Sequence, residues 1–141
     1  MRFGRLSREW SAMNGLLKLT AMIEAATGLA LMATPPVVVR LLLGAEVYGA
    51  GIPLGRVAGV ALLSLGVACW PGPMRAAESR SPALRAMMVY NGLVALYLAR
   101  LGTVGHLGGV LLWPAVALHT LVALLLVWAW RVELRTKATS K

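Results

Sequence analysis

The chain has 141 residues, of which 59% are hydrophobic and 13% are charged, and its formal net charge is +9. A mean hydropathy of +0.75 excludes an ordinary water-soluble domain and indicates an integral membrane protein. Because a membrane-spanning helix needs about 20 apolar residues, we expect four spans in a single all-α transmembrane domain, 1–141, with no separate soluble domain.

The spans are placed between charged and helix-breaking segments. The first ends before Pro35 and Pro36, whose rings prevent simple continuation of the helix. The second ends at the sequence WPGP, and the third begins after Ser81 and Pro82, a good cap and first helical residue. Tryptophans flank the fourth as interfacial anchors. The predicted spans cover about 13–34, 50–70, 83–101 and 110–130, and together they predict a four-helix membrane bundle.

Most of the positive charge lies on one side of these spans. Basic residues precede the first span, separate the second from the third, and follow the fourth; only Arg40, Arg56 and Arg100 lie elsewhere. Basic loops stay on the cytoplasmic side of a membrane, so both termini are predicted to be cytoplasmic. The charge is thereby explained by topology, so we expect membrane lipids as partners and no nucleic acid.

Three of the four predicted spans carry a strongly polar residue near their centres. With a rise of about 1.5 Å per residue, Glu24, Asn91 and His119 lie at similar depth. Tyr90 adds a hydroxyl beside Asn91, and Arg56 lies outward of the midplane with a side chain long enough to reach down. We therefore expect these five residues to form one ligand-binding site, with Glu24 and His119 as candidate catalytic residues.

A purely structural interpretation of these polar residues stays open. Polar side chains in a membrane bundle hydrogen bond to one another and fix helix register, at about 0.6 kcal/mol per bond. For Glu24 this interpretation is weaker, because a carboxylate at the bilayer centre costs about 2.5 to 3.5 kcal/mol. Gly51, Gly55 and Gly59 in the second span have the four-residue spacing that permits close approach of another helix.

The sequence contains few groups that could hold a metal. One glutamate and one histidine at the midplane are too few ligands, so no metal is expected. Cys69 is the single cysteine, which excludes an intramolecular disulfide or a CxxC centre. No phosphate-binding loop, GxSxG elbow or HExxH motif occurs.

The segments KLTAMIEAATGLAL, LGRVAGVALLSLG, WPGP and YNGLVALYLARLG occur in an order that resembles small bacterial four-helix membrane proteins of the DoxX-like group. The resemblance covers nearly the whole chain and rests on its general layout. It implies a multi-pass protein of the inner (plasma) membrane that works beside quinone or thiol redox partners. Since the chain lacks paired cysteines, a thiol-redox role is not expected.

Three functions from different classes follow from these observations, and whether the protein is an enzyme stays open. The favoured expectation is an accessory subunit of a membrane complex whose midplane pocket binds a small amphipathic or lipid-soluble molecule, with a quinone as the possible cofactor. The second is a proton-coupled carrier that acts as a homo-oligomer. The third is a membrane-embedded isomerase or cyclase of a lipid-soluble substrate, with Glu24 or His119 transferring the proton.

Overall fold

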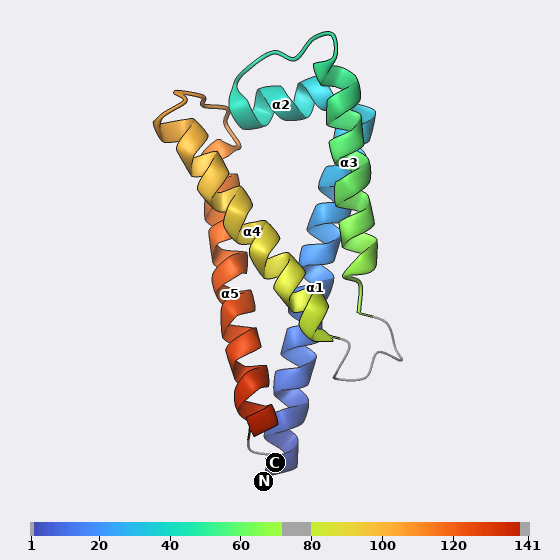
Figure 1. The fold of residues 1–141 in the computed structure, drawn as a ribbon, viewed down its shortest axis with the longest axis vertical. Coiled ribbons are helices and arrows are strands. Elements are labelled where there is room, and N and C mark those ends of the chain that lie inside the picture. Colours follow the sequence, from blue (N-terminus) through green and yellow to red (C-terminus); the bar gives the residue numbers. More distant parts are fainter. Residues whose placement is uncertain (1, 72–79, 139–141) are drawn as a thin grey trace.

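A computed structural model describes residues 2–71 and 80–138, and in these ranges the protein is helical without strands. Figure 1 shows four long helices and one short helix that lies across one end of the others. The helices are α1 (Arg2–Ala33), α2 (Pro35–Leu43), α3 (Gly51–Ala68), α4 (Arg80–Thr103) and α5 (Leu112–Ala138).

The apolar parts of the four long helices overlap the spans expected from the sequence, although α1 itself begins earlier, at Arg2, and α5 ends later, at Ala138. The apolar parts are Asn14–Ala33, Gly51–Ala68, Pro82–Thr103 and Leu112–Arg135. Each is long and apolar enough to cross a membrane. Large apolar side chains such as Leu29, Leu96 and Leu124 are exposed on their outer surfaces, as expected where lipid is the solvent. The structure thus supports a multi-pass membrane protein.

The short helix α2 was not expected from the sequence. Thr34 leaves the helical conformation, with φ −139° and ψ 66°, because the residue before a proline disfavours the α region. Pro35 and Pro36 then occupy the first turn of α2, where their missing N–H groups are not needed. The proline pair therefore ends one helix, as predicted, and also begins the next.

A glycine-rich segment before α5 holds the carboxyl-terminal end of α2. The N–H of Gly108 donates to the carbonyl oxygen of Leu43 at 3.0 Å, and the N–H of Leu111 donates to that of Leu41 at 2.9 Å. These bonds satisfy carbonyls that a helix end otherwise leaves without partners. At Gly109 a Cβ atom would collide with the backbone of Leu41, so only glycine permits this close approach.

The long helices form two pairs arranged as a wedge. Helix α1 packs along α3, and α4 packs along α5. The pairs converge where α1 begins and α5 ends, and they separate toward α2 (Figure 1). The buried core lies at the narrow end and consists of Leu17, Ala21, Cys69, Leu84, Met87, Val122, Leu126 and Ala129. The expected four-helix arrangement is thus two pairs that diverge around α2 at their far end.

Glycines set the spacing between α1 and α3. A Cβ atom on Gly59 would lie 2.6 Å from the carbonyl oxygen of Gly28, and one on Gly28 would lie 2.7 Å from that of Gly59. Gly55 faces Pro35 in the same way, at 2.9 Å, whereas Gly51 adjoins the preceding loop. The predicted close approach of the second span is therefore found at Gly59, where the backbones of α1 and α3 touch, whereas Gly55 makes room for the ring of Pro35.

Candidate functional site

Asn91 of α4 and His119 of α5 form a hydrogen bond inside the second helix pair. The distance from His119 Nδ1 to Asn91 Oδ1 is 2.8 Å. Asn91 is 2% exposed, and its Nδ2 donates to the carbonyl oxygen of Met87, one turn earlier in α4, at 2.9 Å. Both ends of the amide are therefore bonded, which holds it in one orientation against the imidazole ring.

Glu24 of α1 forms a hydrogen bond with Tyr90 of α4, which joins the two helix pairs. The Glu24 side chain is 2% exposed, so its carboxyl group faces the protein interior and not lipid. Tyr90 also contacts His119 edge to face, with ring centroids 6.0 Å apart and planes at 78°. A continuous chain of polar contacts thus runs from Glu24 through Tyr90 and His119 to Asn91.

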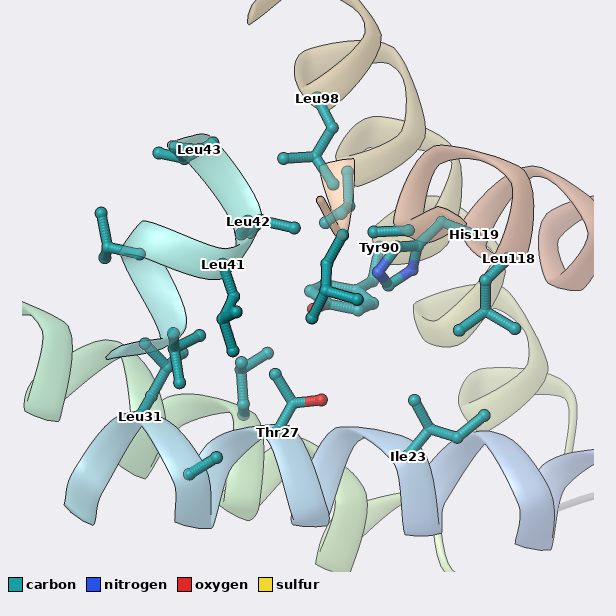
Figure 2. Close-up of a pocket in the computed structure, with 17 residues that line it drawn as sticks. Ile23, Thr27, Leu31, Leu41, Leu42, Leu43, Tyr90, Leu98, Leu118 and His119 are labelled. Carbon is teal, nitrogen blue, oxygen red and sulfur yellow. The ribbon is translucent and has the colours of Figure 1, made fainter. Parts of the chain in front are cut away.

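A cavity of about 430 Å³ lies between the helix pairs, beneath α2. Figure 2 shows Tyr90 and His119 together on one wall, Ile23 and Thr27 of α1 opposite them, and leucines of α2 closing another side. Apart from Tyr90, His119 and Thr27, the side chains that line the cavity are apolar. The cavity is therefore an apolar chamber with a small group of hydrogen-bonding side chains on its walls.

The five residues expected to form the site occupy three different kinds of position. Tyr90 and His119 line the cavity. Glu24 and Asn91 are buried and bond to these two residues without lining the cavity themselves. Arg56 is exposed on α3 and is not among the lining residues.

The position of Arg56 follows from the packing of α3. Gly55 and Gly59 turn one face of α3 toward α1 and Pro35. Because successive residues in a helix are about 100° apart, Arg56 lies to the side of that face, where its side chain is exposed. The structure therefore brings four of the five expected residues together and leaves Arg56 outside the cluster.

The sequence did not indicate the contribution of α2 to the cavity. Val38, Val39 and Leu42 line it from α2, and Thr27 lines it from α1. A signal is visible in retrospect, since the segment PPVVVRLLL combines a proline pair typical of a helix start with an apolar run around Arg40. Arg40 itself is exposed and lies 3.9 Å from Glu46, at the surface.

The described residues contain no group of three or more His, Cys, Asp or Glu side chains that could hold a metal ion. No family model matches the chain, and searches of curated proteins and of solved structures return no significant match. The cavity and the polar contacts around it are therefore the features of the protein that indicate its function.

Proposed function

We propose that the protein binds a lipid-soluble molecule with an apolar body and one polar end, as an accessory subunit of a membrane complex. A quinone is one molecule of this kind. The observation that carries the proposal is the cavity, which is apolar except at Tyr90, His119 and Thr27. Its volume of about 430 Å³ falls within the range of about 300 to 1,000 Å³ typical of small-molecule pockets.

The polar end of the cavity supplies the selectivity in this proposal. Lipid tails are as apolar as leucine, so an apolar molecule gains little by moving from the bilayer into an apolar pocket. A polar group in hydrocarbon, by contrast, has no hydrogen-bonding partner, and leaving it so costs several kcal/mol. Tyr90 and His119 offer such partners, and the apolar walls accommodate the rest of the molecule.

Filling the cavity tests the proposal directly. Ala115 lines the cavity one helical turn before His119, so Ala115→Phe places a ring where the ligand would lie. We expect this variant to fold and to lose a discrete lipid-soluble molecule that co-purifies with the wild type. The measurement is mass spectrometry of the molecules extracted from protein purified in a mild detergent.

Ala117→Phe is the matched control, because Ala117 is exposed on the same helix and does not line the cavity. It should retain the bound molecule at the wild-type level. If the wild type and both variants carry the same bulk lipids in the same ratio, the cavity is not a binding site and the proposal is wrong.

The polar chain favours a second candidate, a membrane-embedded isomerase or cyclase. Tyr90 and His119 both line the cavity, and either can exchange a proton with a bound substrate. Glu24 would then act through Tyr90 and not on the substrate itself. Conversion of the co-purified molecule into an isomer by the wild type, and its loss in His119→Gln, would favour this candidate. The homo-oligomeric carrier stays an alternative that pH-dependent flux into proteoliposomes tests.

We further propose the inner membrane of a bacterium, cytoplasmic termini and a place among DoxX-like proteins, as the sequence suggested. The start of α1 and the end of α5 lie at the same end of the molecule, as do the end of α3 and the start of α4 (Figure 1). Lys18 lies near the start of the apolar part of α1, Arg85 near the start of α4, and Arg131 near the end of the apolar part of α5. The positive-inside rule therefore favours a cytoplasmic location for this end of the molecule.

Cysteine labelling of intact cells tests this orientation in a Cys69→Ser background. A cysteine replacing Ser7 in the first turns of α1 should be shielded from an impermeant thiol reagent. A cysteine replacing Val47, in the loop between α2 and α3, should react. The reverse labelling pattern would place the termini outside the cytoplasm.

A further inference from the structure

The orientation of the Asn91 amide follows from its two hydrogen bonds. One of its polar atoms lies 2.9 Å from the carbonyl oxygen of Met87, which can only accept a hydrogen bond. That atom is therefore the amide nitrogen, Nδ2. The remaining atom, Oδ1, faces His119 at 2.8 Å and can only accept.

This orientation determines which nitrogen of His119 carries the hydrogen. Since Asn91 Oδ1 accepts, Nδ1 of His119 must donate and so bears the hydrogen. Among the described residues, no carboxylate forms an ion pair with the ring, whose partners are the amide of Asn91 and the ring of Tyr90. A neutral ring with its hydrogen on Nδ1 presents Nε2 as a bare acceptor.

The acceptor at Nε2 is available to a bound molecule. His119 lines the cavity, and no described side chain or backbone group forms a hydrogen bond with its Nε2. The Tyr90 ring packs against the imidazole and Asn91 holds its other nitrogen, so the ring has two constraints on its position. In a cavity lined mainly by apolar side chains, an acceptor without a donor leaves a place for a donor from the ligand.

We infer that the polar end of the bound molecule is an uncharged hydroxyl group that donates a hydrogen bond to Nε2 of His119. The ligand class is thereby a lipid-soluble alcohol, such as an isoprenoid alcohol, or a phenol, such as a quinol. Asn91 is a positioning residue in this arrangement, because it sets the tautomer of His119. The inference rests on the proposed function and narrows it, since a carbonyl or an ether offers Nε2 no hydrogen to accept.

Two matched pairs of molecules test the ligand class. The wild type in lipid nanodiscs is mixed with farnesol or its methyl ether, and separately with decylubiquinol or decylubiquinone, and retention is measured by native mass spectrometry. We expect each hydroxyl compound to be retained about tenfold more than its partner, the effect of one buried hydrogen bond of about 1.4 kcal/mol. The two pairs also separate an alcohol-specific site from a quinol-specific one.

The outcomes separate this inference from the proposed function. Equal retention within both pairs, with loss in Ala115→Phe, would overturn the hydroxyl assignment and leave the cavity as a binding site. If the wild type retains all four compounds no better than Ala115→Phe does, the proposed function itself is wrong. In Asn91→Leu the tautomer is no longer held, so the preference for the hydroxyl compound over its ether should fall well below about tenfold, because a ring with its hydrogen on Nε2 can donate to the ether oxygen.

Nitrogen NMR of labelled histidine reads the tautomer without any ligand. A His106→Asn background leaves His119 as the single histidine, and asparagine tolerates the positive φ of 51° at residue 106. The wild-type ring should show a protonated Nδ1 and an unprotonated Nε2, and Asn91→Leu should show a mixture of tautomers. A hydrogen on Nε2 in the Asn91-containing protein would overturn the inference.

Discussion

Gly59→Leu should leave little folded protein, because the new side chain would force α1 away from α3. Even the first added carbon would lie 2.6 Å from the carbonyl oxygen of Gly28 and 2.9 Å from the backbone nitrogen of Met32. Overpacking by a few methylenes costs about 1 to 3 kcal/mol where side chains can shift. Here the obstacle is helix backbone, so we expect a larger cost, measured as the fraction of monodisperse protein after detergent extraction.

Gly92→Leu is the control for this result. Gly92 also lies in the middle of a long helix, but no atom lies within 4 Å of a Cβ atom built there. This variant should be extracted in the same yield as the wild type, since leucine is also a better helix former than glycine. Equal losses for both substitutions would mean that leucine disturbs insertion in general and that α1 and α3 do not meet at Gly59.

Tyr90→Phe should destabilise the protein by about 1 to 3 kcal/mol, because it leaves the buried Glu24 carboxyl group without its hydrogen-bonding partner. Adding Glu24→Leu to this variant should restore most of the lost stability, since replacing both partners by apolar groups is often nearly neutral. The free energy of unfolding is measured by titrating the protein with sodium dodecyl sulfate in mixed micelles.

Tyr97→Phe is the matched control for the hydroxyl, because Tyr97 lies two turns further along α4 and is 63% exposed. Its free energy of unfolding should stay close to that of the wild type. If the double variant Glu24→Leu with Tyr90→Phe has a lower free energy of unfolding than Tyr90→Phe alone, the Glu24 and Tyr90 side chains do not stabilise each other. The bond that joins α1 to α4 would then be disproved.

The four long helices could be predicted from the sequence because lipid imposes a simple requirement. Every backbone polar group in hydrocarbon must be bonded within its own helix, so spans are long apolar runs between charges and breakers. Helix α2 has nine residues, far fewer than a span, and its prolines carry the same signal as a helix end. Its position depends on backbone contacts with Gly108 and Leu111, which no local pattern reveals.

The sequence predicted how deep the polar residues of the candidate site lie in the membrane, but not the direction in which each side chain points. Polar residues at the centres of three spans identified Glu24, Asn91 and His119, and the structure brings them together with Tyr90. The length of its side chain also led us to include Arg56, which the glycine contacts of α3 place outside the cluster. Which residues line the cavity and which lie behind them depends on how the helix pairs diverge, and only the packed structure contains that information.

Photolabelling with a lipid-soluble alcohol tests most directly whether the cavity between the helix pairs binds a ligand. A long-chain alcohol bearing a diazirine is added to the protein in nanodiscs, irradiated, and located by mass spectrometry of peptides. We expect the labels to be concentrated on cavity residues such as Val38, Val94 and Leu118, and to be lost in Ala115→Phe but not in Ala117→Phe. Labels spread evenly over exposed residues such as Leu54, Leu96 and Leu121, and unchanged in Ala115→Phe, would contradict this expectation.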